Sequence, residues 1–417
     1  MALGWLKRVL NRLPCLKRGV KKFLCMAGAA ISDRKTIPTS IVQVTSSRSE
    51  HLFGYYDKCP WNKDDTKMLY LRVTGADKMN ASDNPADIII HDMARETETI
   101  VGQTAAWNVQ QGCMLQWRGP NFDTEILYNT FDGKHYITIV QDVVSGDRRV
   151  VDSPVYSVAS DGVNALTLDF SRLNTFRPGY GYINAPDETA NTRCPDQYCI
   201  WHVNLQTDET KGILKYTELL AFEHKSSMDQ AYHKVNHIMI NPECTRFMFL
   251  HRWIVDGKKY DRLLTCDLDG TGLHNLLDED MVSHSYWLDE ERIITYANTY
   301  ADGRQYYILK DKCRERTIAM NGLLKEDGHP SLSPNGKFIV TDTYPNFRRK
   351  QTIYVYDVEH ARVSKAAEIY ANPRYSEECR CDLHPRWNHS SSAICFDGAQ
   401  KKKRQVYVIG TEEICNG

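Results

Sequence analysis

The chain has 417 residues, enough for two ordinary domains or one large repeat-built domain. Its 52 Lys and Arg residues balance its 53 Asp and Glu residues, so the net charge draws it neither to nucleic acid nor to a membrane. The 13 cysteines are scattered and show no standard zinc-ligand spacing, which favours a reducing compartment and hence a cytoplasmic protein.

The first segment, residues 1–38, differs from the rest. Between residues 3 and 24 seven Lys and Arg residues, with no acidic residue, alternate with Leu, Val and Phe at steps of three or four, interrupted by Pro14. This pattern is typical of an amphipathic anchor, and we expect residues 3–24 to lie on an anionic membrane surface at the inner face of the membrane. An export signal, which would make the protein periplasmic, and a tail without a role are the alternatives.

Residues 39–417 are typical of an all-β protein. Short segments rich in Val, Ile, Tyr and Thr follow one another, separated by Asp, Asn, Gly and Pro, as in "TKMLYLRV", "HYITIVQDV" and "KFIVTDTY". Helical periodicity is scarce in this part of the chain. We therefore expect strands joined by turns throughout.

An internal repeat predicts the architecture. Histidine stands five residues before a turn at His237, His284, His329 and His384, at intervals of 47, 45 and 55 residues. A period of roughly 40–50 residues with several strands is typical of a β-propeller blade. Three earlier segments show the same pattern, which predicts a seven-bladed β-propeller over residues 39–417. "TSIVQVT" near residue 40 can pair with "RQVYVIG" in the last blade and close the ring.

Several motifs resemble known propellers. "SLSPNGKFIV" is similar to the Ser-Pro-Asp-Gly turns of TolB-type propellers, and the blade-opening histidines resemble those of the oligogalacturonate lyase family. "HLFGYYDKCPWN", "QGCMLQWRGP" and "FSRLNTFRPGYGY" resemble segments of uncharacterised bacterial propellers associated with polysaccharide-synthesis genes, including capsule biosynthesis. The resemblance spans residues 39–411. It implies a divalent metal held by three histidines and a glutamine, and a further histidine as the base. Glu326 and Cys381, not Gln, stand three residues before His329 and His384.

The repeated histidines are candidate metal ligands. The innermost strands of a propeller line its central channel, so residues at matched blade positions converge at one mouth of it. We expect His284, His329 and His384 to bind one divalent cation, Mn, Zn or Ca, with His237 within reach of a bound substrate. The alternative is that these imidazoles only hydrogen-bond to backbone between the blades.

Candidate substrate-binding residues belong to the first four blades. An aromatic side chain beside arginine suits a sugar face and the carboxylate of an acidic sugar. Strand residues alternate between faces, so only one of His251 and Arg252 can point at a given site. The candidates for substrate binding are His51, Tyr56, Gln116, Arg118, Arg172, Tyr180 and Tyr182.

Two functions fit this pattern. The first is a metal-assisted polysaccharide lyase that cleaves a uronate-containing glycan by β-elimination, with His237 as base, Tyr55 as acid and Arg177 or Arg252 on the carboxylate. The second is a non-catalytic propeller that binds a glycan or a protein in a membrane-associated polysaccharide assembly. No phosphate-binding loop or serine elbow favours another chemistry.

Overall fold

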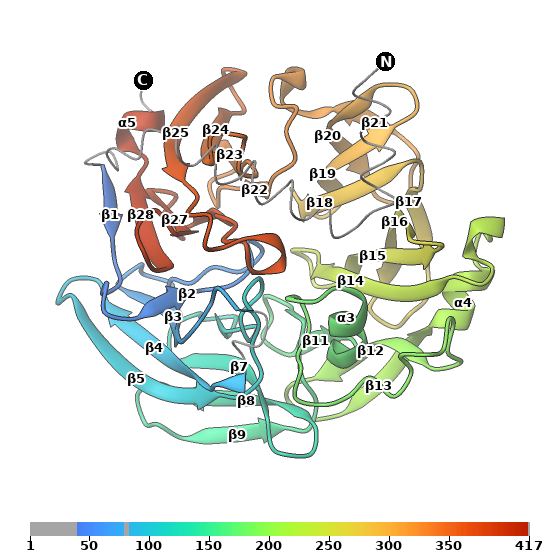
Figure 1. The fold of residues 1–417 in the computed structure, drawn as a ribbon, viewed down its shortest axis with the longest axis horizontal. Helices are drawn as coiled ribbons and strands as arrows, with labels where there is room; N and C mark the ends of the chain where they lie inside the picture. Colours follow the sequence, from blue (N-terminus) through green and yellow to red (C-terminus); the bar gives the residue numbers. More distant parts are fainter. Residues whose placement is uncertain (1–39, 79–82, 416–417) are drawn as a thin grey trace.

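The structure, a computed structural model, describes residues 40–78 and 83–415. These residues form seven four-stranded antiparallel sheets arranged as blades around a central axis (Figure 1). The predicted all-β, seven-bladed propeller is therefore confirmed.

The first four blades contain sixteen strands. They are β2 (Glu50–Leu52), β3 (Lys67–Val73), β4 (Ala86–Asp92) and β5 (Thr97–Thr104); β6 (Gln116–Trp117), β7 (Glu125–Phe131), β8 (Tyr136–Asp142) and β9 (Arg148–Val151); β10 (Ser157–Val158), β11 (Asn164–Thr167), β12 (Tyr198–Asn204) and β13 (Thr210–Lys215); and β14 (Tyr232–Ile240), β15 (Arg246–Val255), β16 (Lys258–Asp267) and β17 (His274–Leu277).

The last three blades contain twelve more. They are β18 (Met281–Trp287), β19 (Arg292–Thr299), β20 (Gly303–Lys310) and β21 (Arg316–Ile318); β22 (Ser331–Leu332), β23 (Phe338–Asp342), β24 (Lys350–Asp357) and β25 (Arg362–Tyr370); and β26 (Arg386–Trp387), β27 (Ala393–Gly398), β28 (Gln405–Gly410) and β1 (Ile41–Gln43).

Helices in the described residues are short. The α-helices are α3 (Phe170–Phe176), α4 (Tyr216–Ala221) and α5 (Glu412–Cys415), and the 3-10 turns are η2 (Ser226–Met228), η3 (Ala319–Gly322) and η4 (Glu377–Cys379). Helix α3 follows the second strand of the third blade, where Asp169 caps its first turn by accepting from the Arg172 backbone N–H. This helix and the loop after it lie beside the channel and bring Arg177 to the site described below.

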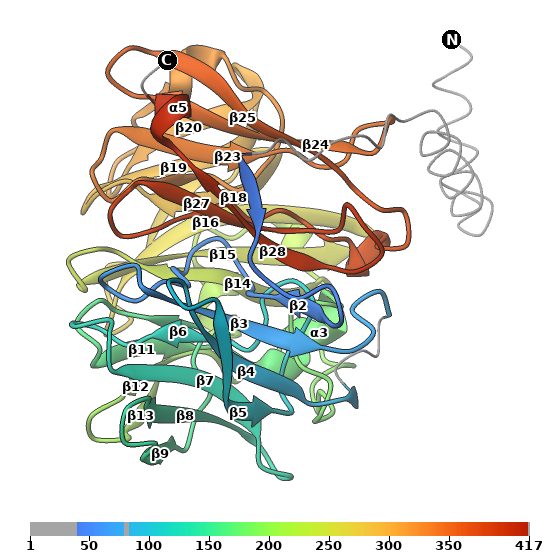
Figure 2. The same ribbon diagram turned by 90° about the vertical axis from the view of Figure 1, so that its left-hand side faces the viewer.

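The ring closes by pairing the two ends of the propeller. Strand β1 pairs with β28 in antiparallel register, Ile41 opposite Ile409 and Gln43 opposite Tyr407. Figure 2 shows β1 alongside β28 at the edge of the last blade. The pairing expected from the sequence is confirmed, and it removes an open sheet edge.

First strands of neighbouring blades contact one another around the axis, for example β14 with β18 and β18 with β22. At three blade boundaries a tryptophan near the end of the first strand ties a blade to the preceding one. The indole N–H donates to a backbone carbonyl across the blade boundary in three pairs: Trp117 to Pro60 at 2.9 Å, Trp287 to Met239 at 2.9 Å and Trp387 to Ser331 at 3.3 Å. Side chains from different blades are thereby held at fixed positions around the channel.

A buried ion cluster joins the last blade to the first. Asp397, fully buried, lies 3.2 Å from Arg386 and 2.6 Å from Arg404, and the Nε of Arg386 donates to the Tyr55 carbonyl. Charges this deep need all their partners, since an unpaired one keeps its full desolvation penalty.

Replacing Asp397 with alanine should therefore lower the free energy of unfolding by about 3–5 kcal/mol, because two buried guanidinium groups lose their carboxylate. Urea denaturation measures this change. The matched control is Asp152→Ala, which removes an exposed carboxylate and should cost no more than about 1 kcal/mol. Equal effects of the two substitutions would contradict the structural role of Asp397.

The expected membrane-binding residues 3–24 lie outside the described residues. No helix within the described part of the chain is long and apolar enough to cross a membrane.

Candidate metal centre and active site

Four histidines from four consecutive blades lie together in the central channel. The ring centroids of His284 and His329 are 4.1 Å apart, those of His329 and His384 are 4.3 Å apart, and those of His237 and His284 are 6.4 Å apart. All four side chains are buried. The convergence expected from the repeat is present, while metal binding by them stays a prediction.

Local irregularities in the backbone aim these side chains at the channel. Strand β14 changes register between Asn236 and Met239, and β18 changes register between Val282 and Ser285, so His237 and His284 both sit at bulges. His237 and His384 also have positive φ angles of 59° and 46°, which residues other than glycine rarely adopt. Strained backbone of this kind is concentrated at functional sites.

The hydrogen bonds of His329 and His384 fix which ring nitrogen is free. Nδ1 of His329 donates to Asp342 at 2.8 Å, and Nδ1 of His384 donates to the Gly54 carbonyl at 3.0 Å. In the neutral imidazoles each Nε2 therefore carries a lone pair, and both Nε2 atoms are buried without a hydrogen-bond partner. Such orphaned lone pairs, oriented by second partners, are typical of metal-ligating histidines.

Asp382 completes a group that fits a metal ion. One ligand atom each from His329, Asp382 and His384 lie within 4.8 Å of one another. Burial alone would raise the pKa of Asp382, but the Arg380 guanidinium, 2.5 Å away, holds it below its ordinary value and keeps the carboxylate charged. Two imidazoles and a carboxylate suit a divalent first-row metal.

His284 occupies a flanking position. Its Nδ1 lies 3.0 Å from the Asp327 carboxylate, and its Nε2 lies 3.5 Å from the Tyr344 hydroxyl. Among the described residues it does not belong to the group with mutually close ligand atoms. The expected set of His284, His329 and His384 thus has a competitor in which Asp382 takes the place of His284.

His237 differs from the other three histidines. Its Nε2 lies 2.9 Å from the Ser285 carbonyl and 3.2 Å from the Ser285 backbone N–H. The tautomer that donates from Nε2 to the carbonyl leaves the lone pair on Nδ1. The Tyr56 hydroxyl is 3.1 Å from Nε2. Burial lowers the pKa of His237 to about 3, although the hydrogen bond to the Ser285 backbone acts in the opposite direction. The ring is neutral at ordinary pH, so one of its nitrogens carries a lone pair.

A cavity of about 180 Å³ lies over His237 and His284. Its wall carries three cations, one carboxylate and three aromatic rings: Arg177, Arg252, Lys259, Asp327, Tyr55, Tyr180 and Tyr344. The guanidinium of Arg177 stacks on Tyr180 at 4.7 Å. The cavity can therefore take an anionic ligand with a face that packs on aromatic rings.

Tyr55 stands between this cavity and the histidines. Its ring centroid is 4.9 Å from that of His384 and 5.7 Å from that of His237. Burial, and then the neighbouring Tyr180, raise the pKa of Tyr55 well above its ordinary value. The phenol keeps its proton and can donate it to a leaving group.

The structure places only some of the sequence candidates at the cavity. Tyr55, Arg177, Tyr180, His237, Arg252 and His284 line it, and Tyr56 lies against His237. The alternation argument is confirmed at the fourth blade. Arg252 faces the cavity, whereas His251 points away into a buried chain of hydrogen bonds with His233 and Arg262.

Three other candidates have structural surroundings instead. Nδ1 of His51 lies 3.1 Å from Gln405, across the closure between the first and last blades. Arg172 donates to backbone carbonyls of the loop after α3, including those of Thr189 and Thr192. Tyr182 stacks on Phe170 in the core with centroids 4.3 Å apart. None of the three lines the cavity.

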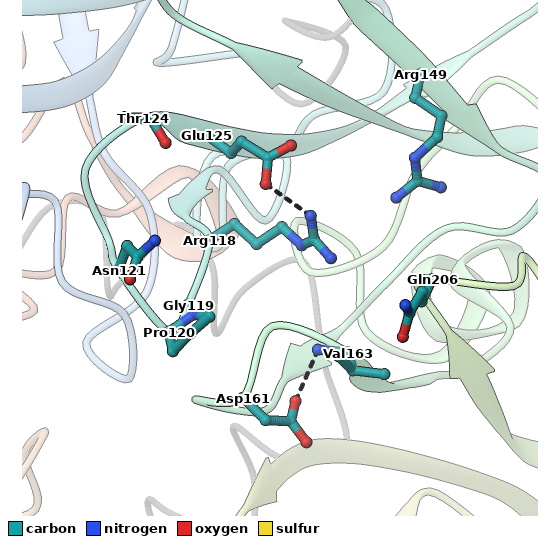
Figure 3. Close-up of a pocket in the computed structure, with 10 residues that line it drawn as sticks. All are labelled: Arg118, Gly119, Pro120, Asn121, Thr124, Glu125, Arg149, Asp161, Val163 and Gln206. Atoms are coloured by element: carbon teal, nitrogen blue, oxygen red, sulfur yellow. Dashed lines mark hydrogen bonds and ion pairs between the residues drawn. The ribbon is translucent and has the colours of Figure 1, made fainter.

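Gln116 and Arg118 lie elsewhere as well. Gln116 lines a separate cavity with Asp57, Trp117 and Tyr286. Arg118 lines a cavity of about 430 Å³ between the second and third blades (Figure 3). There its guanidinium is already paired with Glu125 at 2.7 Å, as the figure shows, so this cavity offers little unpaired charge to a ligand.

Three aspartates of the site are not among the candidates from the sequence, although a sequence pattern marks two of them. Asp327 stands two residues before His329, and Asp382 two residues before His384, so a repeated Asp-x-His marks both. Asp342, at the end of β23, bridges the cluster because its Oδ1 accepts from Nδ1 of His329 and its Oδ2 accepts from the His384 backbone N–H at 3.2 Å.

Two solved structures of oligogalacturonate lyases are similar to this one over most of the chain. A structure of oligogalacturonate lyase in complex with manganese matches with a TM-score of 0.64 and 16% identity, over 89% of this chain and 92% of that one. The oligogalacturonate lyase from Vibrio parahaemolyticus matches with a TM-score of 0.63 and 12% identity, over 90% and 94%. This chain shares the fold of those lyases. At such identities the match shows the fold alone.

More distant propellers match less closely. The β-propeller domain of the Trilobed protease from Pyrococcus furiosus has a TM-score of 0.50 and 11% identity, over 88% of this chain and 94% of that one. No family model matches the chain, and no curated relative was found by sequence. The resemblance of the fold to oligogalacturonate lyase, expected from the blade-opening histidines, is confirmed.

Proposed function

We propose that the protein is a metal-assisted polysaccharide lyase that cleaves a uronate-containing glycan by β-elimination. One observation carries this proposal. The Nε2 atoms of His329 and His384, which have no hydrogen-bond partner, lie in the same channel as the neutral His237, below a cavity lined by cations. The manganese-bound lyase with the same fold supports it.

The cavity wall would bind and orient the acidic sugar. Arg177 and Arg252 offer guanidinium groups for its carboxylate, and Tyr55 and Tyr180 offer rings for its apolar face. Arg252 is itself held by Asp261 at 2.7 Å and by the Val282 carbonyl at 3.3 Å. This positions the charge before the substrate arrives.

The elimination needs one proton removed and one delivered. Nδ1 of His237 takes the proton from C5, the carbon next to the carboxylate. A C4–C5 double bond forms as the C4–O bond breaks, and the Tyr55 hydroxyl gives its proton to the departing oxygen. The proton on His237 and the proton missing from Tyr55 are then exchanged with water.

The residues present fit a divalent metal at His329, Asp382 and His384, where the carboxylate of Asp382 supplies an oxygen that the expected glutamine would otherwise supply. When bound, such a cation would neutralise the substrate carboxylate and make the neighbouring C–H more acidic. Asp342 raises the pKa of His329 against the effect of burial, which makes its Nε2 a stronger ligand.

The test is to incubate the purified protein with polygalacturonate and other uronate-containing glycans in Mn²⁺ and to follow the ultraviolet absorbance of the unsaturated product. We expect product with at least one of them and none after EDTA treatment. Saturable glycan binding without any unsaturated product would replace the lyase with a glycan-binding propeller.

A further inference from the structure

A second cavity, of about 210 Å³, lies farther along the innermost strands than the candidate active site. On β14, His237 lines the first cavity and Met239 lines the second. On β18, His284 lines the first cavity and Tyr286 lines the second. A strand rises about 3.3 Å per residue, so the two cavities occupy levels of the channel that are separated by roughly 7–10 Å.

Buried side chains separate the two cavities. Tyr56 stands in the chain between Tyr55, which lines the first cavity, and Asp57, which lines the second. The Tyr56 hydroxyl donates to the Ser285 carbonyl at 2.8 Å and lies 3.1 Å from Nε2 of His237. Since Tyr56, Ser285 and His237 are all buried, the second cavity is a site distinct from the one that carries the proposed chemistry.

Asp57 gives the second cavity an unsatisfied acceptor. Its Oδ2 accepts from the Lys58 ammonium at 2.7 Å, whereas its Oδ1 is buried without a hydrogen-bond partner among the described residues. The side chains of Asp57 and Lys58 are only 5% and 6% exposed. A buried charged oxygen that lacks a donor is costly for a folded protein, so this position calls for a donor from outside the chain.

The ion pair selects a ligand without net charge. A cation at Oδ1 of Asp57 would lie beside the Lys58 ammonium, and an anion at Lys58 would lie beside the Asp57 carboxylate. A neutral ligand with two adjacent hydroxyl groups suits both residues. One hydroxyl can donate to Oδ1, while the oxygen of the other accepts one of the remaining N–H groups of Lys58.

Aromatic rings supply much of the remaining wall. Those that line the cavity are Trp61, Trp117, Phe122, Tyr286 and Trp287. Such rings pack on the apolar face of a sugar ring, whose edge carries the hydroxyl groups. Burial, and then the neighbouring Asp57, raise the pKa of Tyr286 to about 12, so the phenol keeps its proton as a further donor. Pockets for drug-sized ligands measure roughly 300–1,000 Å³, so this smaller one suits a single ring.

We propose that the second cavity binds one neutral sugar ring through Asp57 and Lys58, with the aromatic wall against the face of the ring. Gln116, expected from the sequence to bind substrate, lines this cavity, and its Nε2 donates to the Met114 carbonyl at 3.1 Å, which leaves Oε1 as an acceptor. A free monosaccharide and a terminal unit of a glycan share this chemistry. The site requires neither the metal nor the acidic sugar of the proposed lyase.

The experiment titrates the EDTA-treated protein with glucose, galactose, mannose, N-acetylglucosamine and their methyl glycosides. Saturation-transfer NMR detects the bound sugar, and tryptophan emission supplies a second signal because three indoles line the cavity. We expect at least one of these sugars to bind with a Kd of about 1 mM or below. Binding of a methyl glycoside would identify a terminal glycan unit as the ligand, and binding of the free sugar alone would identify a monosaccharide.

Two variants locate the bound sugar. Ser160→Phe places a ring in the cavity from an exposed position and should weaken binding at least about tenfold. Asp57→Asn keeps the size of the side chain but removes its charge, and should also weaken binding about tenfold, because charge-assisted hydrogen bonds are roughly twice as strong as neutral ones. Ser145→Phe is the matched control, since Ser145 is exposed between β8 and β9 and lines none of the three cavities described.

Thermal unfolding checks that Ser160→Phe remains folded, and we expect it to unfold at the temperature of its parent because Ser160 is exposed. No saturable binding of any of these sugars up to about 10 mM would mean that solvent alone satisfies Asp57, and would overturn the site. Unchanged affinity in both variants would place the sugar elsewhere, and displacement of the sugar by choline would reveal a cation site; either would also overturn it. Because the metal is removed throughout, sugar binding and lyase activity succeed or fail independently.

Discussion

Replacing His329 with alanine should remove most of the bound divalent metal. His329 is 1% exposed, its Nε2 has no partner, and its Nδ1 is held by Asp342, so the direction of its Nε2 is fixed. Mutation of a residue that only orients a metal ligand typically weakens metal affinity about 10–100-fold. Losing one of three ligands should therefore weaken it by at least this factor. Metal analysis after gel filtration measures it.

The controls of this experiment also decide which residues complete the site. His202→Ala removes a histidine of the third blade outside the cluster and should leave the metal content unchanged. Asp382→Ala should release the metal if Asp382 is the third ligand, whereas His284→Ala should do so if the set expected from the sequence is right. Full metal content in His329→Ala would mean that the channel histidines are not a metal centre.

Replacing His237 with glutamine should abolish most of the lyase activity while leaving the metal in place. A positioned general base contributes roughly 10²–10⁴-fold to the rate, so kcat should fall by about this factor. Glutamine retains hydrogen-bonding groups but cannot take up a proton. Initial rates of unsaturated product formation measure kcat, and titration calorimetry checks that ligand affinity is preserved.

Tyr56→Phe separates the base from its support. The Tyr56 hydroxyl lies against Nε2 of His237 and donates to the Ser285 carbonyl at 2.8 Å, so it positions the ring without facing the cavity. Its removal should lower kcat less than His237→Gln does, because the base itself remains. A His237→Gln protein with the kcat of its parent would show that another group removes the proton.

The fold was predictable because its signal is repeated. One histidine before a turn is ambiguous, but four at nearly constant intervals, each followed by a strand, leave few architectures. The closure by β1 was predictable for a related reason, since a ring with an unpaired edge would be exposed to aggregation. These inferences require only the histidine repeat and the strand pattern, which the sequence shows directly.

The candidate site was predictable only where residues sit at matched blade positions. Arg172 resembles Arg177 in the sequence, yet its guanidinium donates to loop carbonyls, whereas Arg177 lines the cavity. His51 opens its blade as the other histidines do, but faces Gln405 in the closure. The direction of His237 depends on a bulge, and those of His237 and His384 on positive φ angles, which no residue pattern in the chain predicts.

The pairing of β1 with β28 also sets an order of events during synthesis. Strand β1 emerges from the ribosome first but its partner emerges near residue 405, so the ring can close only after about 360 intervening residues have been made. His384 is oriented by the carbonyl of Gly54, a contact across the same closure. A metal ion held by His384 would therefore require ring closure, and partly synthesised chains would be unable to retain it.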